Sequence, residues 1–496
     1  MLDLQEQLAL KDAKIREQEA RIAQLEYELS ELKRLIYGTK SERFRKEEGF
    51  AEQGNLFEYA PEDQPIIQAT EQITYNRGKN NNHKGRNSLP AHLPVKEVVI
   101  EPEEDTSDMI KIGEQVTETL EYTPASLVKL VRIRPKYARK QESEKDPSEH
   151  NEKSIVIAPM PSRPIDKCIA EPNLLSHMIV SKFIDHLPFY RQIGMFKRDF
   201  GWEPPKSTVN DWFVAVCTLL EPLYNKLKEK VLESDYIQAD ESPIKVQDKN
   251  KKGRTHRGFQ WVYHAPDKGI VLFHYHRSRS VQAPRELLAS YKGWVQCDGY
   301  TVYDKLDSIY DDIRLAGCWV HARRGFDKAK DSDPTRAKHV LTLFSKIYQQ
   351  ESGCKELDET QTKIYRNQHI WPLVQELKEW IESQSIKVLP KSPLGKAMTY
   401  CIKQWPKLIK CFEDGRLELD NNLIENKIRP LALGRKNYLF AGSHDAAQRI
   451  AMIYSLFATC KIHEVNPRDW LTYVMENIND TKISDLDKLL PQYFMA

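Results

Sequence analysis

Two aspartates stand in nearly the same local sequence and are the first candidates for chemistry. The segments that end in Asp240 and Asp298, IQAD and VQCD, are each an apolar β-type run followed by a small residue and then an aspartate. Carboxylates at the ends of adjacent strands repel each other unless a cation lies between them. Such oxygen ligands suit magnesium, which keeps several waters for substrate phosphates. The pair therefore indicates a metal site, although a lone aspartate of this kind is more often a turn residue.

A third acidic candidate, Glu425, lies in the segment ELDNNLIENKIRPLALGRKNYLFAGS. Asp420, Asn421 or Asn422 is expected to cap a short helix that places Glu425 and Arg429 one turn apart. Lys427, Arg429, Arg435 and Lys436 follow Glu425, and no acidic residue occurs between residues 427 and 443. From these residues alone, an ion pair with Arg429 on a solvated helix is the simpler interpretation.

The elements that would carry these carboxylates are predicted from residue 235 onward. YIQADESPIKV, GFQWVYHA and GIVLFHYH are rich in β-branched and aromatic residues and predict a three-stranded meander. A helix in PRELLASYK, strands in GWVQCDGY and IRLAGCWVH, and a helix in HARRGFDKAK follow. This order predicts an α/β fold with a ribonuclease H-like core over residues 233–445. Residues from about 333 to 412 are predicted to form a large helical insertion.

The rest of the chain divides by pattern into further predicted segments. Apolar residues repeat every seven positions from Leu8 to Ile36, which predicts a coiled-coil dimerisation helix over residues 1–45, with residues 4–36 in contact. A polar linker is expected over 46–90, a small β-rich module over 91–145 and a helical segment over 155–232. Within that helical segment, a helix-turn-helix contact with DNA and ordinary packing both remain open; Ser207 or Thr208 is expected to cap its second helix. A C-terminal helical segment is expected over 446–496.

Bulk properties set limits on these interpretations. The formal net charge is only +2 over 496 residues, so nucleic-acid binding has to be argued from local clusters of basic residues. The eight cysteines include no C-x-x-C pair, which disfavours a disulfide framework and fits a reducing cytoplasm. No apolar stretch approaches the length of a membrane span, so we expect no membrane association.

Five motifs taken together resemble the insertion-sequence-66 family of bacterial transposases. These are LIYGTKSERF, ADESPIKV, CDGYTVYDKL, GCWVHARRGF and, above all, the long segment around Glu425, and they occur in the family's order across essentially the whole chain. The resemblance implies a DDE transposase in which Asp240, Asp298 and Glu425 are the catalytic and metal-binding carboxylates. It replaces the ion-pair interpretation of Glu425.

The resemblance also implies cofactors and partners. Two Mg²⁺ ions, with Mn²⁺ as a substitute, would be shared by the three carboxylates. DNA at the element's ends and at the target would be bound by basic residues, for which the candidates are Arg323, Arg324, Lys427, Arg429, Arg435 and Lys436. Small accessory proteins of the same element are implied as further partners, and a cytoplasmic protein that joins the nucleoid when bound to DNA is expected.

The sequence departs from the family pattern in one place. Many relatives carry a cysteine-rich zinc-binding module after the coiled coil, whereas EPEEDTSDMIKIGEQV and KYARKQES contain no cysteine. Zinc is therefore not expected. Cys318 and His321 form a C-x-x-H pair without two further evident ligands, so a structural role for His321 at the end of a buried strand is preferred. A nuclease without strand transfer and an inactive DNA-binding remnant are the alternative functions.

Overall fold

The computed structural model describes residues 127–130, 136–138, 155–157, 163–166, 168–248 and 254–494. The predicted coiled coil, the linker and most of the β-rich module lie outside these residues and stay predictions. Of the β-rich module, strand β1 (Lys136–Ala138) is described, and it pairs antiparallel with β2 (Ile155–Ile157).

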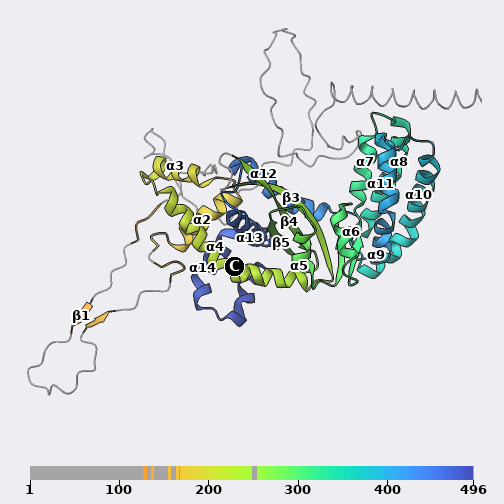
Figure 1. Cartoon of the computed structure of the whole chain (residues 1–496). Coiled ribbons are helices and arrows are strands. Elements are labelled where there is room, and N and C mark those ends of the chain that lie inside the picture. Colours follow the sequence, from red (N-terminus) through yellow and green to blue (C-terminus); the bar gives the residue numbers. More distant parts are fainter. Residues whose placement is uncertain are drawn as a thin grey trace, which may run out of the picture. The chain divides into compact units, whose positions relative to one another are not determined.

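Helices and five longer strands make up the rest of the described chain (Figure 1). In order, they are α2 (Pro172–Phe183), α3 (Phe189–Phe200), α4 (Lys206–Leu232), β3 (Tyr236–Gln247), β4 (Thr255–Ala265), β5 (Ile270–His276), α5 (Gln282–Leu288), β6 (Gly293–Gln296), α6 (Thr301–Asp307), β7 (Ile313–Ala316), α7 (Trp319–Lys328), α8 (Pro334–Glu351), α9 (Glu359–Tyr365), α10 (Trp371–Ser385), α11 (Pro393–Leu408), α12 (Asn422–Tyr438), α13 (His444–Ile462) and α14 (Pro467–Asn477). No helix among the described residues is both long enough and apolar enough to cross a membrane.

The sheet is mixed, with the strand order β5-β4-β3-β6-β7. The first three strands form the predicted antiparallel meander, and β6 and β7 then run parallel to β3. Each parallel step is connected through a helix, α5 before β6 and α6 before β7, because a parallel neighbour requires a crossover connection. The predicted α/β class is therefore confirmed, and β3 is the central strand.

Helix α13 covers the open edge of the sheet at β5. The backbone N–H groups of Val271 and Phe273 donate to the hydroxyls of Thr459 and Ser455 at 3.3 and 2.8 Å, and that of Tyr275 donates to the Gln448 side chain at 3.2 Å. An uncovered edge strand would leave these donors free to pair with another chain. The boundary predicted between residues 445 and 446 thus falls inside a helix that belongs to the sheet's own core.

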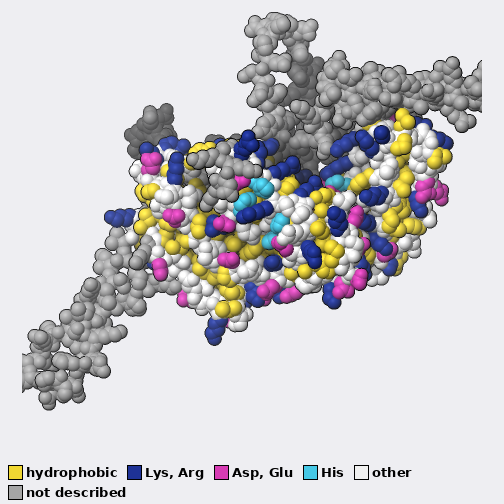
Figure 2. Space-filling model, in the orientation of Figure 1, with side chains coloured by type: hydrophobic (Ala, Val, Ile, Leu, Met, Phe, Trp, Pro, Cys, Tyr) yellow, Lys and Arg dark blue, Asp and Glu magenta, His cyan; other side chains and the backbone are white. Residues whose placement is uncertain are grey.

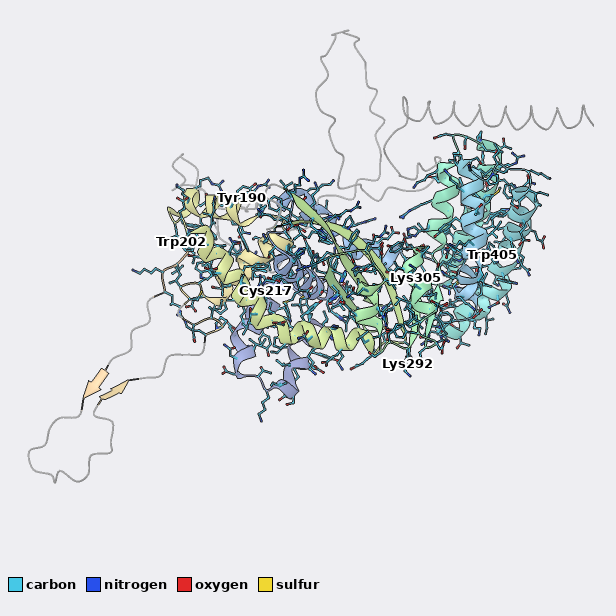
Figure 3. The ribbon with its side chains drawn as sticks, viewed as in Figure 1. Tyr190, Trp202, Cys217, Lys292, Lys305 and Trp405 are labelled. Atoms are coloured by element: carbon cyan, nitrogen blue, oxygen red, sulfur yellow. The ribbon has the colours of Figure 1, made fainter. Side chains whose placement is uncertain are left out.

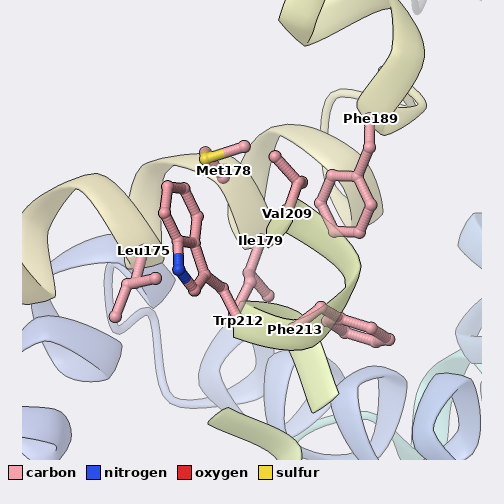
Figure 4. Close-up of a pocket in the computed structure, with 7 residues that line it drawn as sticks. All are labelled: Leu175, Met178, Ile179, Phe189, Val209, Trp212 and Phe213. Atoms are coloured by element: carbon pink, nitrogen blue, oxygen red, sulfur yellow. The ribbon is translucent and has the colours of Figure 1, made fainter. Parts of the chain in front are cut away.

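The predicted helix, turn and helix before the sheet are α3 and α4. Apolar side chains of α2, α3 and α4 point toward one another around a small cavity, as Figure 4 shows for Met178, Phe189 and Trp212. The expected cap is wrong: α4 begins at Lys206, so Ser207 and Thr208 lie within its first turn, and no side chain caps it. Packing of these helices is therefore observed, and contact with DNA stays a prediction.

Helices α7, α8, α10 and α11 supply most of a second apolar core, distinct from the main one, to which Tyr236, Trp294 and Ala316 of the sheet also contribute. Figure 1 shows α7, α8, α10 and α11 side by side. Trp319 of α7 is fully buried there, with ring centroids 5.9 Å from Trp405 of α11 (labelled in Figure 3) and 6.0 Å from Phe344. Helical structure thus fills most of residues 334–412, as the sequence pattern predicted.

Candidate active site

Asp240 lies within the central strand β3, and Asp298 lies two residues after the end of β6. The last paired residues of the two strands are Gln238 and Gln296, so both aspartates follow the paired segment by two residues. The expectation that both aspartates end their strands needs correction, because β3 continues to Gln247 in its pairing with β4. Asp240 is therefore fixed by strand pairing on one side, while β6 has already ended on the other.

Glu425 is placed in the first turn of α12, and hydrogen bonds bring that helix to β3. Asn421 precedes the helix without capping it; its side-chain amide donates instead to the Ala239 carbonyl, at 3.3 Å. At the far end of α12, Ala441 exchanges backbone hydrogen bonds of 2.8 Å with Lys245 and Gln247. Helix α12 thus runs alongside β3, with Glu425 near Asp240.

The three carboxylates lie within electrostatic reach of one another. Burial, followed by repulsion from Glu241, Asp298 and Glu425, raises the pKa of Asp240 to about 8. Asp298 is half-buried and accepts a hydrogen bond from the Tyr300 backbone N–H at 2.9 Å. The structure therefore gathers Asp240, Asp298 and Glu425 into one acidic region, although they are distant in the sequence.

Glu425 is not paired with Arg429 but with Arg324 of α7. Arg324 Nη2 donates to Glu425 Oε2 at 2.6 Å, and His321 Nε2 lies 3.9 Å from Oε1. Glu425 Oε1 is buried and has no hydrogen-bond partner. Burial lowers the pKa of His321, so this histidine is neutral at pH 7. Within the described residues, no group of three or more Asp, Glu, His or Cys side chains is arranged to hold a metal ion.

Cys318 and His321 have different surroundings. The Cys318 thiol is buried, and its sulfur accepts the Asn421 backbone N–H at 3.3 Å, which helps to hold the chain just before α12. His321 lies in the first turn of α7 and faces Glu425. This differs from the predicted place at the end of a buried strand, because β7 already ends at Ala316.

The predicted DNA-binding residues differ in their surroundings. Arg429 and Lys436 are exposed on α12, whereas Lys427 and Arg435 are partly buried. The Arg435 guanidinium donates to the Pro243 carbonyl, and it thereby fastens α12 to β3. Arg323 and Arg324 are partly exposed on α7. Figure 2 shows Lys and Arg side chains gathered along the edge of the molecule where α12 lies in Figure 1.

The structure adds a buried carboxylate that the sequence analysis did not single out. The Glu241 side chain is only 2% exposed, and one of its oxygens accepts a hydrogen bond of 2.7 Å from Arg279 Nε. The Arg279 guanidinium lies 4.0 Å from the centroid of the Tyr300 ring, and the Tyr300 hydroxyl donates to the Arg279 carbonyl at 2.6 Å. Glu241 could have been noticed in the sequence because it directly follows Asp240, but nothing in the sequence pointed to Arg279.

The residues of this region fall within a match to a known protein family. The family model described as "Transposase IS66 family" matches residues 167–449, which include all three carboxylates. The chain belongs to the IS66 transposase family. Models described as "IS66 C-terminal element" and "Transposase C of IS166 homeodomain" match residues 455–492 and 24–98 of this family member.

Relatives of similar length occur in Sinorhizobium fredii (strain NBRC 101917 / NGR234). The uncharacterized protein y4jD is 30% identical over 96% of this chain and 95% of its own length. The uncharacterized protein y4qI is 29% identical over 96% of this chain and 89% of its own length. The similarity to these two relatives therefore extends over nearly the whole chain, but their names assign no activity.

Proposed function

We propose that this IS66 family member is a DNA transposase that cuts DNA at the ends of its element and joins those ends to target DNA. The observation that carries the proposal is the convergence of Asp240 on strand β3, Asp298 just after strand β6 and Glu425 on helix α12. Like-charged carboxylates drawn together at a partly buried site are unfavourable unless they serve a cation. If the carboxylates had only a structural role, each would be expected to form an ion pair with a Lys or Arg side chain.

The sheet supports a ribonuclease H-like core for this activity. Three antiparallel strands are followed by two parallel ones, and the order β5-β4-β3-β6-β7 puts the first strand of the meander in the centre. Asp240 lies on this central strand and Asp298 follows its parallel neighbour. We infer the catalytic domain that the sequence predicted over 233–445, with a helical insertion near 333–412, and we extend it through α13, which covers the sheet edge at β5.

The chemistry of the three donors suits a divalent metal ion, and the described side chains would have to close around the ion to hold it. All three side chains offer the oxygen ligands that Mg²⁺ and Mn²⁺ prefer, and the buried, unpaired Glu425 Oε1 leaves an acceptor unused. Asp240, Asp298 and Glu425 would hold two Mg²⁺ ions, with Mn²⁺ able to substitute. When bound, the ions would make water or a DNA 3′-hydroxyl a better nucleophile and stabilise the leaving oxygen at the phosphate.

The residues of α12 and α7 would bind and orient the DNA. Arg429 and Lys436 lie seven residues apart on α12, so both are on one face of the helix, which begins next to the carboxylates. They would contact phosphates and fix the register of the strand without reading its bases. Arg323, Arg324, Lys427 and Arg435 remain candidates, but Arg324 and Arg435 would first have to leave Glu425 and the Pro243 carbonyl.

Assembly completes the proposal. Two element ends must be brought together, and a coiled coil over residues 4–36 would supply the dimer or larger assembly that holds both. Accessory proteins of the element and a place at the nucleoid are proposed from the family resemblance. Zinc is not part of the proposed mechanism.

A cleavage and joining assay tests this function. The full chain would be incubated with Mg²⁺ and DNA that carries the inverted repeats flanking its gene. We expect end cleavage and strand transfer by the wild type, and neither reaction by Asp240→Asn, Asp298→Asn or Glu425→Gln, each of which should still bind the DNA. Asp312→Asn is the matched control, because Asp312 precedes β7 at the opposite end of the parallel strands and is exposed.

The outcomes separate the alternatives. Cleavage by the Asp240→Asn variant would overturn the assignment of the site. Cleavage without joining by the wild type would identify a nuclease. Specific DNA binding without either reaction would identify an inactive DNA-binding derivative of a transposase.

A further inference from the structure

The two aspartate motifs share a glutamine as well as an aspartate, and the proposed chemistry does not use it. Gln238 and Gln296 each precede their aspartate by two residues. Both side chains are fully buried, and they lie opposite each other in the parallel pairing of β3 and β6. A buried amide is unfavourable unless its hydrogen bonds are made, so a pair at matching positions requires an explanation.

Both glutamines reach the chain segment that leads into α12. Gln296 Nε2 donates to the carbonyls of Glu418 and Gly317, at 2.7 and 3.0 Å. Gln238 Nε2 lies 3.3 Å from the carbonyl of Asp420, to which it donates. Side chains of β3 and β6, each two residues before an aspartate, thus hold the segment that precedes Glu425.

Tyr236 joins the two amides into one network. Its hydroxyl donates to Gln296 Oε1, and it accepts from Gln238 Nε2 at 3.1 Å and from the Glu418 backbone N–H at 3.3 Å. Tyr236 is 4% exposed. We call Tyr236, Gln238 and Gln296 the glutamine latch. Through side chains on two strands, it bonds to the backbone of residues 418 and 420.

The latched segment sets the position of Glu425. Residues 418–421 belong to no helix or strand, and α12 begins directly after them. The Glu425 N–H donates to the Asn421 carbonyl at 3.0 Å, so the glutamate follows the segment by one helical turn. A shift of this segment would therefore move Glu425 relative to Asp240 and Asp298.

We propose that the glutamine latch positions Glu425 so that the three carboxylates bind divalent metal ions together. The inference rests on the proposed transposase function, since it assigns positioning residues to that same site. Tyr236, Gln238 and Gln296 would act as positioning residues, because they are buried and reach Glu425 only through the backbone of residues 418 and 420. Outer residues that orient metal ligands change metal affinity by about tenfold to a hundredfold when they are altered. Misplacement of a reacting group by about 1 Å has effects of similar size.

The test compares buried glutamines that donate hydrogen bonds to the segment before α12 with a buried glutamine that donates to another helix. Gln238→Leu and Gln296→Leu remove the latch amides while they keep similar volume. Gln260→Leu is the matched control, because Gln260 is equally buried on β4 but donates to the Ala447 carbonyl of α13, at 2.9 Å. Tyr236→Phe removes only a hydroxyl, and it carries the test if a leucine variant does not fold.

Mn²⁺ binding to the full chain without DNA is measured by calorimetry, alongside the unfolding midpoint of each variant. We expect Gln238→Leu and Gln296→Leu to weaken Mn²⁺ binding by about tenfold or more. Tyr236→Phe should weaken it by less, and Gln260→Leu should lower the unfolding midpoint without a change in Mn²⁺ affinity. A merely structural network would lower the unfolding midpoint and leave the Mn²⁺ affinity unchanged.

Two contrary results would have different meanings. If the latch variants bind Mn²⁺ like the wild type while Asp240→Asn does not, the latch proposal is overturned and the proposed site stands. If Asp240→Asn also binds Mn²⁺ like the wild type, both the site and the latch that serves it are overturned.

Discussion

Two regions of the structure that bury charged side chains pair those charges to very different extents. In the helical insertion, Arg366 is 3% exposed and forms two hydrogen bonds to Glu351, at 3.0 and 2.5 Å. Its remaining donors reach the carbonyls of Cys411 and Leu417, at 3.0 and 2.7 Å. Opposite charges are thus paired there, and their hydrogen bonds are completed.

The acidic region on the sheet lacks this balance. Glu241, Asp298 and Glu425 all repel the charged form of Asp240. Arg279 forms an ion pair with Glu241, and Arg324 forms one with Glu425. One oxygen each of Glu241 and Glu425 is buried without a partner. Buried opposite charges that are fully hydrogen-bonded stabilise a fold. Carboxylates that cluster without enough cationic partners are typical of a functional site.

The largest expected effect is the loss of stability when Arg366 is replaced. If this loss did not occur, the contrast between the paired charges of the insertion and the acidic region on the sheet would not hold. Arg366→Met leaves Glu351 and two carbonyls without their partner, so we expect it to lower the free energy of unfolding by about 3 to 5 kcal/mol. Asp240→Asn replaces a carboxyl group that must take up a proton or bury its charge on folding, so without metal it should leave stability unchanged or raise it. Urea unfolding without divalent ions measures both. Equal losses for the two variants would mean that both groups of charges are structural.

A second prediction concerns pH. The pKa of Asp240 is raised in the folded protein to about 8, mainly by burial, so the folded state binds a proton that the unfolded chain releases near pH 4. Stability should therefore fall as pH rises from about 4 to about 8, and Asp240→Asn should remove this contribution. Urea unfolding across that range without metal measures the difference. The same pH dependence in both proteins would contradict the assigned protonation.

A third prediction concerns the ion pair between Arg324 and Glu425. In this arrangement the guanidinium competes with a metal ion for the carboxylate, so Arg324→Gln should tighten Mn²⁺ binding in the absence of DNA. The gain should reach about fivefold at most, the equivalent of about 1 kcal/mol for a partly exposed pair. Calorimetry with Mn²⁺ checks this. Weaker binding by the variant would show that Arg324 orients Glu425 for the metal.

The smallest expected effect is on DNA affinity. Arg429→Ala and Lys436→Ala should each reduce the slope of log K against log salt concentration by about 1, because each removes one phosphate contact. Lys292→Ala is the control, since Lys292 pairs with Asp312 at the opposite end of the parallel strands. Fluorescence anisotropy between low and physiological salt measures the slopes. An unchanged slope for Arg429→Ala and Lys436→Ala would remove α12 as the DNA-binding surface.

Much of the frame was predictable from local patterns. The meander over β3, β4 and β5 and the helices of residues 334–412 followed from strand and helix periodicity, which depends on near neighbours. Some errors concerned local boundaries, such as the start of α4 and the end of β3, and others concerned side chains whose partners lie on distant elements. Asp420, Asn421 or Asn422 was expected to cap α12, but the Asn421 side chain bonds to the Ala239 carbonyl, and nothing in the sequence indicated that Arg324 of α7 would pair with Glu425. Sequence spacing cannot show a partner that another element supplies.

The sequence by itself determined the chemical identities: two aspartates in matching β-type motifs, a glutamate ahead of a basic strip, and the family to which these motifs belong. Only the tertiary structure decided which groups meet. It brought Glu425 to Asp240 through α12 and surrounded both with Arg324, His321 and Glu241. The reason is physical: residue types and short-range propensities are written locally, whereas electrostatic coupling depends on distances that are fixed by the packing of remote segments.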